Sequence, residues 1–211
     1  MGEQIQLGLK KEMFSSIELR LNSYMNGRIY PFEIATTLNF ILYNEFNKYR
    51  EDLEGNACFL KPVFVGEYIV DKNNPYQTRV FCHQGTEACS PIPIKRGVIG
   101  RAIRTGRDQY VPDVTKDLEH IGCDPNMEGS ELVLNSWSDH YPSGPYRGLQ
   151  LPLGVLDLDF NIKNALELKD IQKLRNIWNV WGKKIFPGYP TFLPLKEVYK
   201  DAFEISLLMS A

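Results

Sequence analysis

The sequence predicts an α+β fold, with an antiparallel sheet of about six strands, helices packed on one face of it, and helical extensions at both ends. Two observations support this prediction. Apolar residues recur at helical spacing near both ends of the chain, whereas short runs of β-branched and aromatic residues, separated by turns, fill the middle. Because long helices do not alternate with the strands, a parallel βαβ arrangement is disfavoured.

Two helices are predicted before residue 55. Apolar residues follow helical spacing from Leu9 to Met25, and Asn26-Gly27 ends that helix. The second helix begins at Pro31, a residue that suits the first turn of a helix. We expect both helices to act as scaffold on the sheet or as contacts within a homodimer.

The middle of the chain contains the predicted strands. They span 57–70, 77–82, 109–114, 130–137 and 149–161, with a short helix from Gly97 to Gly106 between the second and third. A strongly amphipathic helix at 165–186 follows them, and its apolar face is predicted to contain Leu168, Ile171, Leu174, Ile177 and Trp181. The expected division is therefore N-terminal helices over 1–55, a central domain over 56–186, and a Pro-rich tail with a short helix over 187–211.

Composition excludes several classes of function. The 211 residues have a net charge of −2, so the chain has no basic field for nucleic acid and no polybasic arm for a membrane surface. It has neither an apolar leader nor a run of about 18 apolar residues that could span a bilayer, so we expect a cytoplasmic protein. Its four cysteines, Cys58, Cys82, Cys89 and Cys123, are then expected to be free thiols; their even number also fits a secreted disulfide protein.

Three acidic residues form the most informative pattern. Side chains alternate along a strand, so Asp157 and Asp159 share one face of the run 154–160, and Glu131 lies on a second strand. If the two strands are neighbours, the acids surround one hollow, with Cys123 at its rim. Such a cluster suits a ligand ammonium group, a bound cation, or proton delivery to an oxygen. The alternative is a solvated sheet face.

Several motifs occur in the order typical of one family. They are Cys89, Gly97-Val98-Ile99-Gly100, Val111-Pro112-Asp113-Val114, His120-Ile121-Gly122-Cys123-Asp124, Ser130-Glu131 and Gly154-Val155-Leu156-Asp157-Leu158-Asp159. From about Asn56 to Phe186, the sequence resembles GAF domains, and among them the free methionine-(R)-sulfoxide reductases. Two positions depart from the family pattern: Ile99 replaces a cysteine, and Phe64 stands where a tryptophan is usual.

The resemblance implies a GAF-like sheet and a specific chemistry. Cys123 would attack the sulfoxide sulfur of free methionine-(R)-sulfoxide and become a sulfenic acid, and Cys89 would resolve it as a disulfide that thioredoxin reduces. Glu131, Asp157 and Asp159 would hold the substrate amino group and supply a proton, with Phe64 against the S-methyl group. This chemistry needs no metal and no organic cofactor.

Other interpretations remain open from sequence alone. A GAF module that binds a small molecule or senses oxidants without catalysis fits the missing third cysteine. A zinc site built from Cys82, Cys89, His120 and Cys123 is conceivable, although the C-x-x-C pairs typical of structural zinc are absent. Cys58 and Cys82 are interpreted as structural residues, with Cys82 a potential second resolving thiol. His120 either lowers the pKa of Cys123 or is simply solvated.

Overall fold

The computed structural model describes residues 2–28, 30–51, 62–123, 128–139 and 149–188. The α-helices are α1 (Gly2–Tyr24), α2 (Pro31–Glu51), α3 (Gly97–Thr105) and α4 (Leu168–Ile185). The strands are β1 (Pro62–Val70), β2 (Gln77–Gly85), β3 (Ile92–Pro93), β4 (Gln109–Val111), β5 (Ser130–Trp137) and β6 (Pro152–Phe160). A short 3-10 turn, η1, spans Val114–Lys116.

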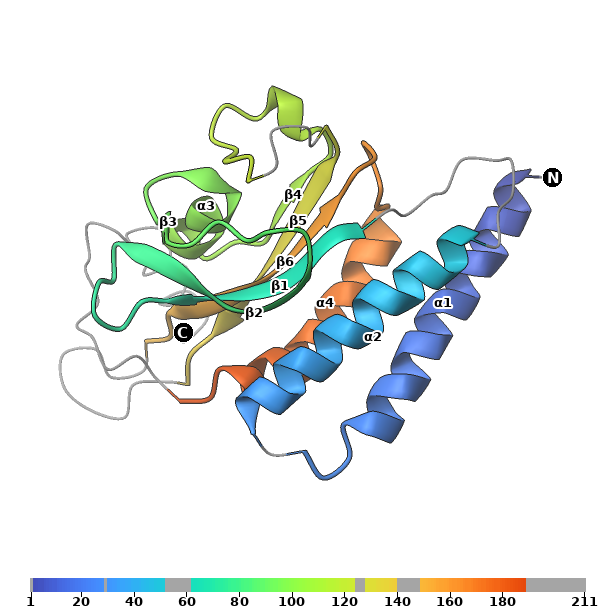
Figure 1. Cartoon of the computed structure of the whole chain (residues 1–211), viewed down its shortest axis with the longest axis horizontal. Helices are drawn as coiled ribbons and strands as arrows, with labels where there is room; N and C mark the ends of the chain where they lie inside the picture. Colours follow the sequence, from blue (N-terminus) through green and yellow to red (C-terminus); the bar gives the residue numbers. More distant parts are fainter. Residues whose placement is uncertain (1, 29, 52–61, 124–127, 140–148, 189–211) are drawn as a thin grey trace.

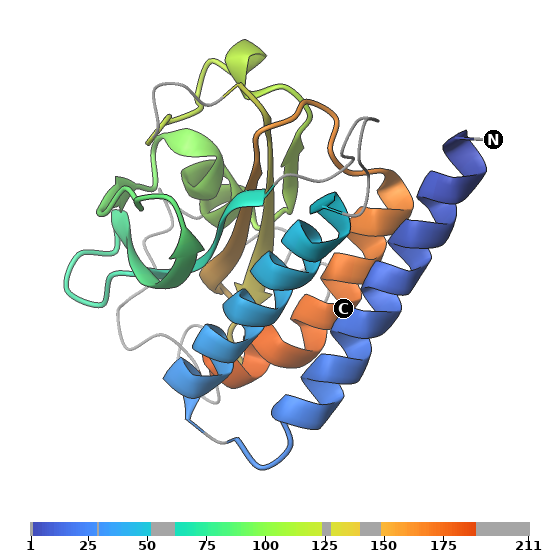
Figure 2. The ribbon, with the colours of Figure 1, turned by 45° about the vertical axis from the view of Figure 1, so that its right-hand side comes forward.

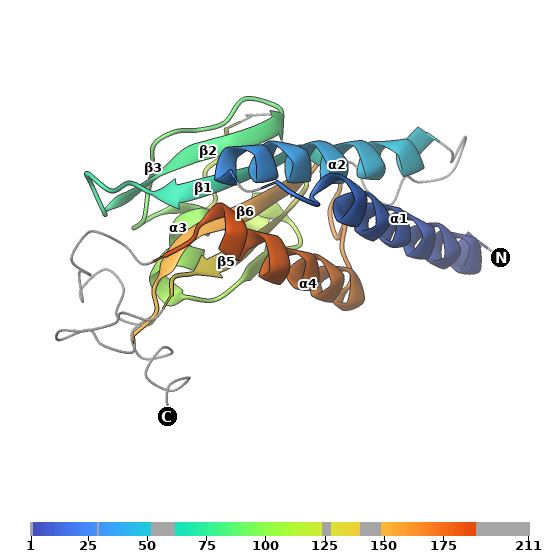
Figure 3. The same ribbon diagram turned by 90° about the horizontal axis from the view of Figure 1, so that it is seen from below.

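The strands form one antiparallel sheet in the order β3-β2-β1-β6-β5-β4. The long helices α1, α2 and α4 form a layer on one side of it, and the short helix α3 covers the other side (Figures 1 and 3). The predicted α+β class with about six strands is therefore confirmed. The central strands β1 and β6 lie side by side although they are far apart in the sequence, so the middle of the sheet depends on long-range pairing.

Alternation along β6 explains why the protein has two cores. Leu156, Leu158 and Phe160 point toward the long helices and are fully buried there. Val155 points the other way and packs with residues of α3, among them Ile103. The intervening Asp157 therefore faces the α3 side of the sheet, as the period of two predicts.

A buried ion pair joins the first helix to the last. Lys10 of α1 donates to Asp170 of α4 over 2.8 Å, and the two residues are only 5% and 0% exposed. Asp170 also accepts from the backbone of Glu167 and so caps the start of α4. Figure 2 shows α1 running alongside α4. The N-terminal helix is thus fixed to the helical layer by charge as well as by apolar contact.

Some sequence predictions need correction. Leu168 is 82% exposed because it opens the first turn of α4 and faces solvent, whereas Leu174 and Trp181 are buried as predicted. Strand β3 is only two residues long and was not predicted. Cys58 and the predicted start of the first strand lie outside the described residues, as does the predicted C-terminal helix. Within the described part of the chain, no helix has the length and apolar character needed to cross a bilayer.

Candidate active site

A cavity opens on the α3 side of the sheet. Its walls come from β1, β5, β6, the start of α3, the segment around β3 and the loop that precedes β5. The lining residues are Phe64, Tyr68, Thr86, Glu87, Ile92, Gly97, Val98, Ile99, His120, Ile121, Cys123, Glu131, Asp157 and Asp159. Five of the six catalytic and substrate-binding residues that the resemblance implies are in this set, namely Phe64, Cys123, Glu131, Asp157 and Asp159; the sixth, Cys89, is bonded to Cys123.

Strand register brings the three acids together. Glu131 pairs with Asp159 across β5 and β6, and Asp157 lies two residues along β6 on the same face. One carboxylate oxygen from each of the three lies within 4.8 Å of the others. Glu131 and Asp157 are buried, and Asp159 is partly buried. The solvated-face interpretation is therefore wrong for these residues.

Burial and mutual repulsion make this cluster of carboxylates electrostatically unfavourable. Burial raises the pKa of Asp157 well above its usual range, and the charges of Asp159 and Glu131 raise it further. Burial and the charge of Glu131 likewise raise the pKa of Asp159. Asp157 Oδ1 and Asp159 Oδ1 are buried and have no hydrogen-bond partner among the described residues. A cation with N–H donors would satisfy both the charge and these oxygens.

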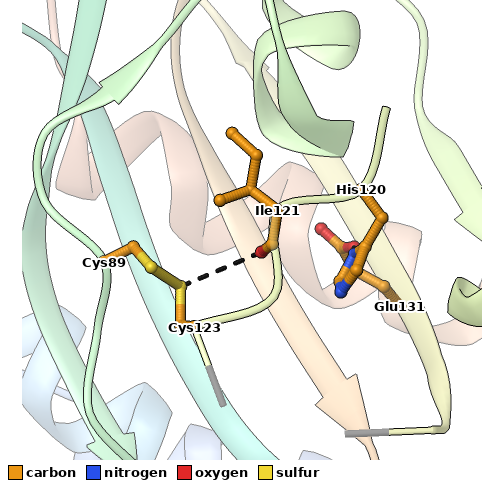
Figure 4. Close-up of a disulfide and its surroundings, with 5 residues drawn as sticks. All are labelled: Cys89, His120, Ile121, Cys123 and Glu131. Atoms are coloured by element: carbon orange, nitrogen blue, oxygen red, sulfur yellow. Dashed lines mark hydrogen bonds and ion pairs between the residues drawn. A yellow bond between two sulfur atoms is a disulfide. The ribbon is translucent and has the colours of Figure 1, made fainter. Parts of the chain in front are cut away.

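The two candidate redox cysteines meet at the cavity mouth. Cys89 and Cys123 form a disulfide with their Cα atoms 5.5 Å apart (Figure 4). Cys123 is exposed and lines the cavity, while Cys89 is partly buried in the segment between β2 and β3. A thiol pair that can reach bonding geometry without rearranging the sheet fits a nucleophile and its resolving partner.

His120 is the lining residue whose contacts the sequence did not reveal. It is neither solvated nor bonded to Cys123: its Nδ1 lies 3.0 Å from Glu131 Oε2, and its side chain is 14% exposed (Figure 4). This contact lowers the pKa of Glu131, although burial has the larger effect and the net shift is upward. The sequence did not predict this pairing, because the two residues are eleven positions apart and their contact depends on how the loop folds over β5.

Tyr68 is a second lining residue that sequence reasoning missed. It shares a face of β1 with Phe64, and the two rings lie 6.2 Å apart. Burial raises the pKa of its hydroxyl, and the charges of Asp157, Asp159 and Glu131 raise it further. The period-two spacing from Phe64 was the available signal. The two aromatic rings give the cavity an apolar wall beside its acidic one.

Gly66 makes room for Phe64, and an alanine there is expected to disturb it. The Phe64 ring stacks on His83 at 5.4 Å, and a Cβ on Gly66 would lie 2.7 Å from both side chains. Gly66→Ala is expected to lower the free energy of unfolding by about 1–3 kcal/mol, the usual cost of overpacking, as measured by urea denaturation. Combining it with Phe64→Leu should recover part of that loss. An unchanged midpoint for Gly66→Ala would show that the ring moves aside without strain.

The remaining cysteine among the described residues, Cys82, lies away from the cavity. Cys82 packs against the core on the long-helix side of the sheet, whereas the Cys89–Cys123 pair lies on the α3 side. Burial raises its pKa. Cys82 therefore cannot act as a second resolving thiol, and the set Cys82, Cys89, His120 and Cys123 does not converge on a zinc ion. In the described part of the chain, the grouping with metal-ligand spacing is the carboxylate trio.

No family model matches the chain, but several curated proteins are similar to it in sequence. Protein ZMO0507 of Zymomonas mobilis is 38% identical over 101 residues, which are 47% of this chain and 56% of that protein. GAF domain-containing protein A of Dictyostelium discoideum is 28% identical over 82% of this chain and 93% of its own length. The free methionine-R-sulfoxide reductase of Escherichia coli is 34% identical over 44% of this chain and 50% of its own length.

The solved structures agree. A GAF domain superposes with a TM-score of 0.67 at 22% identity, covering 83% of this chain and 88% of that one. The reduced form of the Staphylococcus aureus enzyme fRMsr superposes with a TM-score of 0.57 at 26% identity, covering 85% of this chain and 94% of that one. The chain has the GAF fold and is similar in sequence to free methionine-R-sulfoxide reductases.

The GAF fold accounts for the order of the strands in the sheet. The match to the first of these relatives spans only about half of that protein, at 56% of its length.

Proposed function

We propose that this protein reduces free L-methionine-(R)-sulfoxide to methionine. The observation that supports this most strongly is the meeting of two cysteines with a cluster of three carboxylates, two of them buried and one partly buried, at one small cavity. The substrate has a matching distribution of groups: an ammonium, a carboxylate, and a methyl sulfoxide at the end of a short apolar chain. In addition, relatives of the chain are named free methionine-R-sulfoxide reductases.

The acids bind the substrate ammonium in this proposal. Asp157 and Asp159 have buried oxygens without partners among the described residues, so an ammonium would gain charge-assisted hydrogen bonds and relieve their mutual repulsion. The first turn of α3, from Gly97 to Ile99, also lines the cavity, and the N–H groups at the N-terminus of a helix suit the substrate carboxylate. Phe64 would then contact the S-methyl group.

The redox chemistry takes place at Cys123. Its sulfur takes the oxygen of the sulfoxide: the S–O bond of the substrate breaks, an S–O bond forms on Cys123, and methionine leaves with its sulfur reduced by two electrons. The thiol of Cys89 then attacks the sulfenic sulfur, releases water and forms the Cys89–Cys123 disulfide. The Cα distance of 5.5 Å allows this closure, so the thiol lost at Ile99 is not needed.

An external dithiol must complete the cycle, and we propose thioredoxin. Cys123 is exposed, so the disulfide is accessible to an attacking thiolate from a protein partner. We further propose a cytoplasmic homodimer. Its contacts would involve the exposed aromatic residues Tyr24, Phe32 and Phe40 of the α1–α2 hairpin, which are 51–58% exposed.

A thioredoxin-coupled assay tests the proposal. The full chain is mixed with free L-methionine-(R)-sulfoxide, thioredoxin, thioredoxin reductase and NADPH, and methionine is measured by chromatography. Turnover is expected for the R epimer and not for the S epimer, since the cavity orients the sulfur toward a single thiol. Cys89→Ser should release one equivalent of methionine per chain and then stall with thioredoxin, because Cys123 stays a sulfenic acid.

The assay also separates the rival function. A GAF module that only binds would show saturable binding of methionine sulfoxide by calorimetry and no methionine formation at any thioredoxin concentration. That result would contradict the proposed reaction while leaving the binding site intact.

A further inference from the structure

The imidazole of His120 has one nitrogen bound and one unbound. Nδ1 is 3.0 Å from Glu131 Oε2, whereas Nε2 is buried and has no hydrogen-bond partner among the described residues. Both side chains are well shielded, at 14% and 6% exposure. A histidine whose two nitrogens differ in this way can hold a carboxyl group with one and exchange a proton through the other.

Most of the charged groups around this pair are acidic. One carboxylate oxygen of Glu131 lies within 4.8 Å of one from each of Asp157 and Asp159 on β6, and the charges of Arg101 of α3 and Asp117 of the same loop also act on it. Tyr68 approaches the acids from β1. Among the residues that line the cavity, His120 is the one with a basic side chain. It is therefore the group that can offset the negative charge on Glu131 inside the cavity.

Sulfoxide reduction requires such a proton carrier. Overall, the Cys123 thiol and the sulfoxide give the sulfenic acid and the thioether: the thiol loses its proton as it attacks, and the sulfoxide oxygen gains one as its bond to sulfur breaks. Nothing else is consumed, so one proton must travel from the sulfur of Cys123 to the oxygen. Cys123 lies three residues after His120 in the same loop and lines the same cavity.

We infer that His120 is a positioning residue for this proton transfer: through Nδ1 it holds Glu131, which protonates the sulfoxide oxygen, and through Nε2 it takes up in return, by way of the cavity, the proton that the cysteine releases. This inference rests on the proposed function. Glu131 delivers the proton directly, and His120 restores it, so the pair ends the reaction in its starting state. Asp157 and Asp159 are left to the substrate ammonium.

The loop that carries His120 is anchored independently of this contact. Arg101 binds Asp117 with a two-pronged ion pair whose shorter distance is 2.5 Å, and Arg104 binds Glu119 at 2.5 Å. The backbone N–H of His120 donates to Asp117 over 3.2 Å. His120 can therefore be changed without releasing the loop, and Glu119→Gln is a matched control that weakens the anchor while leaving the imidazole in place.

The test compares His120→Asn with wild type in the fully reduced chain. Asparagine can still donate to Glu131 from the place of Nδ1 but has no second proton-binding atom. We expect kcat to fall about 10- to 100-fold, which is no more than the smallest loss typical of removing a general acid or base. KM should stay within about threefold of the wild-type value. The alkaline fall of kcat should move to higher pH, because losing the imidazole removes an interaction that lowers the pKa of Glu131.

Two further measurements guard against a purely structural effect. Added imidazole should restore part of the kcat of His120→Ala but should not restore Glu131→Gln. The control Glu119→Gln should keep kcat within about threefold of wild type, since it leaves the proton path intact. An equal loss in Glu119→Gln, or no rescue by imidazole, would mean that His120 only supports the loop and would overturn the inference.

The outcomes separate the inference from the function on which it rests. Methionine formation by wild type, with unchanged kcat and pH profile in His120→Asn, would refute the role of His120 and leave the proposed reaction standing. Absence of methionine formation by wild type would refute both.

Discussion

Replacing Cys123 with serine is expected to lower turnover of free methionine-(R)-sulfoxide to less than about one-thousandth of the wild-type rate, as is typical when a covalent nucleophile is removed. The reason is specific to the site. Cys123 is the one cysteine that lines the cavity of the described residues, so no other thiol there can take the oxygen. Methionine release in a single-turnover experiment with the reduced chain measures the effect directly.

Cys82→Ser is the matched control for this variant. Its side chain lies on the long-helix side of the sheet, and burial keeps its thiol protonated by raising its pKa. Turnover should therefore stay close to wild type. Equal loss in both variants would point to general damage, and equal activity in both would remove Cys123 from the reaction.

Asp157→Asn is expected to have the second largest effect on activity. Removing one member of a buried charge pair costs about 2–5 kcal/mol, so kcat/KM should fall about 30- to 5,000-fold, mostly through weaker binding of the ammonium. Calorimetry of substrate binding to Cys123→Ser and to Cys123→Ser/Asp157→Asn isolates the binding step. Asp139→Asn, which changes an exposed carboxylate beyond β5, serves as the control.

The same variant should be more stable than wild type above neutral pH. The pKa of Asp157 is raised in the folded chain, so its favourable contribution is complete below the unfolded pKa and is lost as pH rises through the folded value. Asparagine does not ionise and escapes this loss. Urea unfolding should therefore show a higher midpoint for Asp157→Asn at pH 8 and a much smaller difference at pH 4. A lower urea midpoint for Asp157→Asn at pH 8 would contradict the repulsion inferred among Glu131, Asp157 and Asp159.

The sequence predicted the faces of the sheet better than its edges. In β6 the alternation of Leu156 and Leu158 with Asp157 and Asp159 identified both faces correctly, because a period of two leaves no freedom once one face is apolar. The polar end of β2, through Gly85, was missed because no apolar residue marks it; its pairing with Phe64 of β1 holds it in the sheet. A strand as short as β3 carries no pattern at all.

At the site, the sequence predicted the residues that a local strand pattern marks, but not the contacts between distant segments of the chain. The acids were found because they lie on strands with clear alternation. The bond between His120 and Glu131 and the place of Tyr68 were not found, because each depends on how segments far apart in the sequence meet. Leu168 shows the limit of helical periodicity, which gives the face of a helix but not where the neighbouring element stops covering it.

The path of the chain gives the Cys89–Cys123 bond a wider significance. Cys89 leaves one half of the sheet, after β2, and Cys123 approaches the other half, before β5, so their bond acts as a strap across the central strands. In the oxidised chain the disulfide lies beside the cavity that contains the acids, and reduction breaks this bond. We therefore expect the disulfide form to bind the reductant and the dithiol form to bind the amino acid, each in turn.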